Sequence, residues 1–131
     1  NLRYNIKNAI IPPQVQVIKS ESFYSHKKLK SIIFTDDSQL KSIKKAIFYD
    51  SPIEKLVLPS TLEYISDECF DSIDYLTAIE VSPKNNIFTV ISNKYLVRKS
   101  DENSQNFDVI VSTRRETSDT SQNIHLIDAV I

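Results

Sequence analysis

Residues 53–83 read IEKLVLPSTLEYISDECFDSIDYLTAIEVSP, and the end of this stretch repeats the pattern of its beginning. Both ends carry apolar residues at positions i, i+3 and i+5, with a proline directly after them or one residue later. The pattern L-x-x-I-x-x-x-x-F lies between the two ends. Self-similarity at a spacing of about 20–50 residues is typical of repeat architectures, so the fold depends on whether the rest of the chain repeats too.

Six apolar positions with this spacing occur in three copies. The period is 25 residues from Ile18 to Ile43 and 22 residues from Ile43 to Ile65. Six aligned positions in three copies indicate a repeat and not a coincidence. The copies are Val15, Ile18, Phe23, Leu29, Ile32 and Phe34; Leu40, Ile43, Phe48, Ile53, Leu56 and Leu58; and Leu62, Ile65, Phe70, Leu76, Ile79 and Val81, preceded by the end of an earlier copy at Ile6, Ala9 and Ile11.

Each copy is expected to contain a short strand. The endings LKSIIF, IEKLVL and LTAIEV place two apolar residues two positions apart, as one face of a strand requires. The central segments KSESFYSH, KKAIFYDS and SDECFDSI are polar around one phenylalanine and predict a helical turn or two. Ser20 and Ser66 are the expected helix N-caps. The residues expected to point inward are Ile32 and Phe34, Leu56 and Leu58, and Ile79 and Val81.

A unit of this size cannot bury its own apolar face, so neighbouring units stack into a solenoid. The predicted fold is therefore an α+β repeat solenoid with one short strand and one short helix per repeat and a period of 22–25 residues. The repeats resemble the BspA-like class of leucine-rich repeats, and LPSTLEYISDECF is a close match to its repeat. The resemblance covers about residues 2–83 as repeats, and it is expected to extend further. The chain departs from it where the family has glycine, at Lys19, Lys44 and Ser66, and where it has alanine before phenylalanine, at Ser22, Ile47 and Cys69.

The chain divides into three expected segments. Residues 1–83 are the leucine-rich repeats, with the end of one coil and three complete coils. Residues 84–123 contain NNIFTVISNKYLVRKS and NFDVIVST, whose alternating pattern predicts an inserted β-hairpin or three-stranded meander, and then a polar loop. Residues 124–131 read as the start of a further repeat, opened by Ile127 and Val130.

The composition is that of one soluble globular domain, or a piece of one. The chain has 131 residues, of which 40% are hydrophobic and 25% charged. It has no glycine, so Asn, Asp, Ser and Pro are expected to build the turns. Its single cysteine excludes an intrachain disulfide. No apolar run reaches the ~18 residues of a membrane span, so we expect no direct membrane insertion.

No constellation of residues predicts catalysis, a cofactor or a metal site. His26 and His125 lie far apart in the sequence and are interpreted as isolated surface side chains. Cys69, beside Phe70, is interpreted as a small buried core residue. The segment DENSQN has Asn106 where a calcium loop takes glycine, and it is interpreted as a solvated turn. The lysines of HKKLK and LKSIKK predict no nucleic-acid binding, because the sequence pI is about 6.1.

The candidate partner-binding surface is the outer side of the predicted sheet. Three branched apolar side chains in one solvent-facing row favour an interaction site. Two alternatives stay open: β-branched residues favour strands in any case, and a neighbouring element could cover them. The residues between the inward pairs are Ile10, Ile33, Val57 and Glu80, and those two positions before them are Asn8, Ser31, Lys55 and Ala78.

These features predict a non-enzymatic protein–protein interaction module. The resemblance implies adhesion or recognition at the cell surface, through a concave sheet that contacts a host, matrix or assembly protein. The alternative is an intracellular structural scaffold in a cytoplasmic or cytoskeletal assembly. Residues 1–58 carry ten Lys/Arg and five Asp/Glu, whereas residues 59–131 carry six and twelve. This charge asymmetry favours possible end-to-end stacking of chains.

Overall fold

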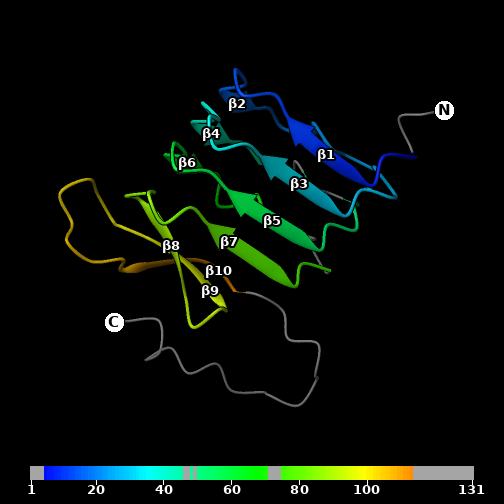
Figure 1. The fold of residues 1–131 in the computed structure, drawn as a ribbon. Coiled ribbons are helices and arrows are strands. Elements are labelled where there is room, and N and C mark those ends of the chain that lie inside the picture. Colours follow the sequence, from blue (N-terminus) through cyan, green and yellow to red (C-terminus); the bar gives the residue numbers. More distant parts are fainter. Residues whose placement is uncertain (1–4, 46–47, 49, 71–74, 114–131) are drawn as a thin grey trace, which may run out of the picture.

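The computed structural model describes residues 5–45, 48, 50–70 and 75–113 of the chain. The described residues form ten strands in three sheets (Figure 1). The first sheet contains β1 (Asn8–Ile11), β3 (Ser31–Phe34), β5 (Lys55–Leu58) and β7 (Ala78–Val81), and the second contains β2 (Val17–Ile18), β4 (Ser42–Ile43) and β6 (Tyr64–Ile65).

Both of these sheets are parallel, and each turn of the chain adds one strand to each sheet. In the first sheet Asn8 pairs with Ser31, and Lys55 pairs with Ala78. In the second sheet Ile43 pairs with Ile65, so that residues one repeat apart lie side by side. We call such a turn a coil: coil 1 carries β1 and β2, coil 2 carries β3 and β4, coil 3 carries β5 and β6, and coil 4 begins with β7. The predicted repeat solenoid is confirmed.

The hydrophobic core lies between the two parallel sheets. The first sheet contributes the predicted inward pairs, all of which are buried except Val81, which is half-buried and packs against the core. The second sheet contributes Ile18, Ile43 and Ile65. Alternation along each short strand therefore places every second residue in the core and leaves its neighbour on the outer face.

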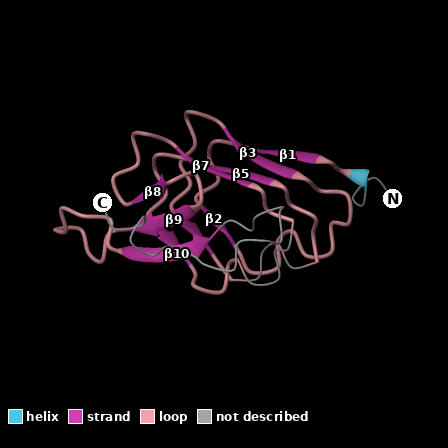
Figure 2. Cartoon of the chain, turned by 90° about the horizontal axis from the view of Figure 1, so that it is seen from below, coloured by secondary structure: helices cyan, strands magenta, loops and turns pink. Residues whose placement is uncertain are grey.

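The predicted short helix in each repeat is wrong for the described residues. Between β2 and β3 the backbone forms successive turns, in which Ser22 N donates to Lys19 O (3.2 Å) and Tyr24 N to Glu21 O (3.0 Å). Glu21 and Ser25 have positive φ angles of 66° and 55°, which a right-handed helix cannot contain. Helical backbone is confined to a turn at Asn5, and strands and loops make up the rest of the described chain (Figure 2).

The helix prediction fails because the central segments are short. A segment of about ten residues is too short to nucleate a helix on its own, so tertiary packing decides its conformation. Ser20 and Ser66 therefore do not cap helices. The phenylalanines keep their predicted role as anchors: Phe48 is fully buried, and Phe23 and Phe70 pack half-buried against the core.

The turns are built without glycine, as the composition predicts. Among the described residues, φ is positive at Glu21, Ser25, Asp50, Ser92 and Asn93. Lys19, Lys44 and Ser66, where the resembling family has glycine, are not among them. Lys44 N donates to Ile18 O and Ser66 N to Ile43 O, both at 3.0 Å. These positions therefore continue the hydrogen bonding between coils, and glycine is not required there.

The predicted meander is present as a third, antiparallel sheet of β8 (Phe88–Ile91), β9 (Tyr95–Arg98) and β10 (Val109–Thr113). Phe88 and Leu96 are buried in the main core, while Tyr95 and Val97 form a separate small cluster with Phe107. The division of the chain at residues 83 and 123 stays a prediction. The proposed further repeat at residues 124–131 lies outside the described residues.

Asn85 joins coil 3 to the beginning of the meander. Its side-chain amide donates to Pro59 O (2.9 Å) and Leu62 O (3.1 Å). Its carbonyl oxygen accepts from the N–H groups of Ile87 and Phe88, both at 2.8 Å. Asn85 is buried, and these four bonds satisfy both ends of its side-chain amide.

Candidate interaction surfaces

The predicted outer residues of the first sheet lie in two rows across the coils. The outer row is Ile10, Ile33, Val57 and Glu80, and the second outer row is Asn8, Ser31, Lys55 and Ala78. The sheet register pairs Ile10 with Ile33 and Val57 with Glu80. Ile10 is 67% exposed and Ile33 is 39% exposed, while Val57 is half-buried. The outer row therefore presents branched apolar side chains to solvent over three consecutive coils.

Polar contacts surround this apolar row. The Lys55 ammonium lies 3.4 Å from the Glu80 carboxylate, and the Ser31 hydroxyl donates to Asn8 Oδ1 at 2.5 Å. A hollow of about 310 Å³ lies beside Val57 and is also lined by Pro59 and Lys84. An apolar centre with a polar rim and an adjoining hollow is the usual composition of a protein-binding surface.

The ion pairs of the described residues all run between consecutive coils. In each pair the lysine belongs to the earlier coil and the carboxylate to the next one. All of them are exposed, so screening by solvent leaves each pair with little effect on stability. Several lysines of the basic first half of the chain are thus paired with carboxylates inside the same solenoid. End-to-end stacking between chains stays a prediction. The pairs are Lys27–Asp50, Lys30–Glu54 (3.2 Å), Lys41–Glu63 (2.8 Å), Lys45–Glu68 (3.8 Å) and Lys55–Glu80 (3.4 Å).

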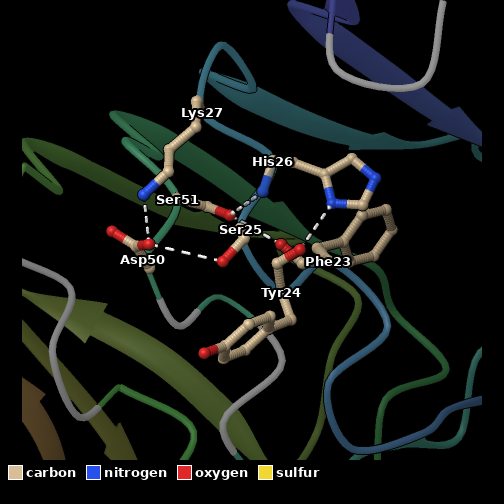
Figure 3. Close-up of polar contacts among 7 residues, drawn as sticks. All are labelled: Phe23, Tyr24, Ser25, His26, Lys27, Asp50 and Ser51. Carbon is tan, nitrogen blue, oxygen red and sulfur yellow. Dashed lines mark hydrogen bonds and ion pairs between the residues drawn. The ribbon is translucent and has the colours of Figure 1, made fainter. Parts of the chain in front are cut away.

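One polar cluster fastens coil 1 to coil 2 (Figure 3). Ser51 Oγ donates to Phe23 O (2.6 Å) and accepts from His26 N (3.2 Å). The imidazole Nδ1 lies 3.1 Å from Tyr24 O, and it must carry the proton because a carbonyl oxygen only accepts. His26 is 9% exposed, so its interpretation as a surface side chain is wrong: the packing of the two coils buries it.

Asp50 belongs to the same cluster and carries a perturbed carboxyl. The hydrogen bond from Lys27 is the main cause that lowers the pKa of Asp50 from its ordinary value of 3.8, and Ser25 contributes a further hydrogen bond. A lowered pKa in the folded state means that the carboxylate stabilises the fold above its unfolded pKa. This contribution is lost as the pH falls through the lowered value.

We therefore expect Asp50→Asn to lower the melting temperature slightly at pH 7 and to have no effect well below pH 3.8. Asparagine tolerates the positive φ of 58° at this position, so the backbone is retained. Thermal unfolding at about pH 7 and about pH 2.5 measures the difference, with Asp36→Asn as a control for general charge effects. An equal loss at both pH values would show that the hydrogen-bonding shape of the side chain, and not its charge, stabilises the cluster.

No group of three or more His, Cys, Asp or Glu side chains in the described part of the chain could hold a metal ion. Cys69 is buried in the core, as the sequence predicts. His125 lies outside the described residues. In the same part of the chain no helix is long and apolar enough to cross a membrane.

A second surface was not predicted from the sequence. Tyr64, on the outer side of β6, is 52% exposed and borders a pocket of about 460 Å³ between coil 3 and the residues that flank β8 and β9. The position of Tyr64 could have been predicted from the repeat alignment. Tyr64 occupies the same place in its repeat as Val17 and Ser42, and these three residues pair side by side in the second sheet. The pocket itself depends on how the meander packs, which the repeat pattern does not specify.

The parallel strands pair residues that are one repeat apart in the sequence, and they have buried inner pairs and an exposed outer row. This arrangement defines a solenoid of the leucine-rich-repeat class. The particular family follows from the sequence of the repeats. The chain belongs to the family described as the BspA type leucine rich repeat region, whose model matches residues 2–108 in six copies. The match extends beyond residue 83, where the expected repeats end, and includes β8 and β9. No curated protein matches the chain at a significant level.

Two solved structures have a similar fold. The pneumococcal vaccine antigen PcpA is 24% identical, with a TM-score of 0.67 over 72% of this chain. A leucine rich cell surface protein from Faecalibacterium prausnitzii A2-165 is 19% identical, with a TM-score of 0.63 over 72% of this chain. The aligned region is only 24% of the length of each of these proteins. At this identity the likeness shows the fold alone.

Proposed function

We propose that this chain is a non-enzymatic protein-binding module of a cell-surface protein and that the outer row contacts its partner. The observation that carries the proposal is the exposure of branched apolar side chains in register across three coils. Ile10 and Ile33 remain 67% and 39% exposed on the outer face of the first sheet. Exposed apolar residues that are contiguous, and not scattered, mark interaction sites on soluble proteins.

The surroundings of the row support the same proposal. The ion pair of Lys55 with Glu80 and the hydrogen bond of Ser31 with Asn8 place polar groups beside the apolar side chains. Protein interfaces commonly have an apolar centre and a polar rim. The family and its surface-protein neighbours favour a partner outside the cell, such as a host or matrix protein, and adhesion as the biological result.

Substitution of the outer row tests the binding surface. The double variant Ile33→Asp/Val57→Asp is expected to fold and to lose binding, because two carboxylates would be desolvated in the interface. The measurement is the binding of the labelled chain to intact cells and to immobilised matrix proteins. Val17→Asp is the matched control: Val17 is 46% exposed, β-branched and in the second sheet, so its variant should bind like the original chain.

The single variant Ile10→Asp keeps the test decisive if the double variant is unstable. Ile10 is the most exposed residue of the row, so its replacement should cost less than about 1 kcal/mol of stability. If Ile10→Asp and the double variant both bind as tightly as the original chain, the outer row is not the binding surface. If the original chain binds no cell and no matrix protein, the adhesion proposal is wrong.

The cellular location is tested separately. Antibody labelling of intact source cells is expected if the parent protein is displayed on the surface. Labelling only after permeabilisation would contradict the surface proposal and favour the alternative, an intracellular structural scaffold. In that case the outer row would be expected to contact a component of the internal assembly, and co-purification with that assembly would identify it.

A further inference from the structure

The second parallel sheet has an open edge at β6. The sheet order is β2-β4-β6, so β4 lies on one side of β6 and no described strand lies on the other. Tyr64 N donates to Lys41 O (3.1 Å) and Ser66 N to Ile43 O (3.0 Å), both toward β4. Successive residues of a strand direct their N–H and C=O groups to opposite edges, so those of Ile65 point away from β4.

The preceding coil shows what such groups bind when a neighbour is present. Ile43 is the residue of coil 2 that pairs with Ile65, and its carbonyl accepts the hydrogen bond from Ser66 N of the next coil. Ile65 has no corresponding neighbour among the described residues. Unpaired N–H and C=O groups at a sheet edge are a template for the addition of another strand.

The pocket of about 460 Å³ lies against this open edge. Tyr64 and Ile65 line one side of it, and Ile87, Phe88 and residues 98–102 line the other. The meander is therefore close to β6 in space but does not pair with it (Figure 1). The volume is in the range of about 300–1,000 Å³ that binding pockets usually have.

The lining of the pocket carries a net negative charge, because it contains four carboxylates and two cations. The cations are Arg98, which donates to Lys99 O at 2.9 Å, and Lys99, whose Nζ lies 5.4 Å from the centre of the Phe107 ring. Among the carboxylates, Glu63 pairs with Lys41 and Asp101 accepts from Asn103 N. The remaining two carboxylates of the lining, which have no partner among the described residues, are Asp67 and Glu102.

We propose that an extended basic segment of a partner protein adds as a strand to the open edge of β6. Its backbone would bond with the N–H and C=O of Ile65, and a lysine or arginine side chain would lie in the pocket against Asp67 and Glu102. Tyr64 borders the same pocket, and its ring already has Lys44 Nζ at 5.4 Å from the ring centre, so we assign the recognition of the cation to the two carboxylates.

This mode of binding combines two sources of affinity and specificity. Main-chain hydrogen bonds supply affinity in strand addition, and pockets for alternate side chains supply specificity. The site lies on the second sheet and shares no residue with the outer row of the first sheet. The inference is therefore independent of the proposed function, and either can fail without the other.

The test uses the full chain and a labelled peptide of alternating lysine and valine, with fluorescence anisotropy as the readout. The peptide is expected to bind, and a peptide of alternating glutamate and valine is not. The double variant Asp67→Asn/Glu102→Gln should weaken binding by about tenfold or more, since a hydrogen bond to a charged group contributes at least about 1.5 kcal/mol. The control variant Glu21→Gln/Asp36→Asn makes the same change of charge outside the pocket and should bind like the original chain.

Two further measurements separate strand addition from simple charge attraction. A lysine–valine peptide with all of its backbone nitrogens methylated should lose binding, because neither of its edges can donate to the carbonyl of Ile65. A photoreactive residue at position 64 should attach to the peptide. Equal binding of the methylated peptide or of the acidic peptide, or no binding of any peptide, would overturn the proposal. Attachment of position 64 to residues 114–131 of the same chain, or to a second copy, would also overturn it.

Discussion

Asn85→Ala is expected to lower the free energy of unfolding by about 3–5 kcal/mol. Each buried polar group that loses its partner costs about 1–3 kcal/mol, and this change removes the partner of four. The carbonyls of Pro59 and Leu62 and the N–H groups of Ile87 and Phe88 would all lose their bonds to the side chain. Urea unfolding followed by circular dichroism measures the loss.

The neighbouring Asn86 provides a matched control, because it is the same residue type in the same turn and is exposed. Asn86→Ala is expected to change stability by less than about 0.5 kcal/mol. Asn85→Asp retains the shape of the side chain but removes both donated bonds and buries a charge, so it should be at least as damaging at neutral pH. If Asn85→Ala and Asn86→Ala have equal effects, Asn85 does not join the meander to coil 3.

Phe48→Ala is the second substitution with a large expected effect, a loss of about 3–5 kcal/mol. Phe48 has no exposed surface, and its ring stacks on that of Phe23 from the neighbouring coil, with 6.4 Å between the ring centres. Removing the ring would leave a cavity between coils 1 and 2. Because a domain of this size is stable by only about 5–15 kcal/mol, the transition midpoint should shift substantially.

Phe107→Ala is the control for this prediction. Phe107 is half-buried and packs on the small cluster of Tyr95 and Val97, apart from the main core. The same chemical change there should cost clearly less than at Phe48. Similar losses for the two variants would contradict the role of Phe48 as the anchor of the repeat, and they would indicate that the coils and the meander unfold as one unit.

The inward residues of the strands could be predicted because every coil requires them. Ile32 and Phe34 point into the core because they are two positions apart, and each later coil repeats the pair at the same spacing. The same alternation predicts that Ile33 is outside, and it is. The binding role of the outer row stays a prediction, since exposure alone does not name a partner.

The central segments could not be predicted in the same way. A polar stretch around one phenylalanine is compatible with a helical turn or with a series of other turns, because either buries one ring. Packing against the next coil selects between them, and Ser25 and Asp50 take positive φ angles where their coils meet. The burial of Asn85 could have been inferred from the repeat. Asn85 lies four residues after the end of β7, and the buried Ser38 lies four residues after the end of β3.

The sequence by itself determined the solenoid, its period and the inward face of each strand. These depend on local spacing that every coil must satisfy to bury its apolar side chains. Only the tertiary structure decided the turns that replace the helices, the pairing of lysines with carboxylates of the next coil, and the pocket at β6. These depend on which segments become neighbours when coils of 22 to 25 residues stack, and a slip of one residue in that stacking would change every one of them.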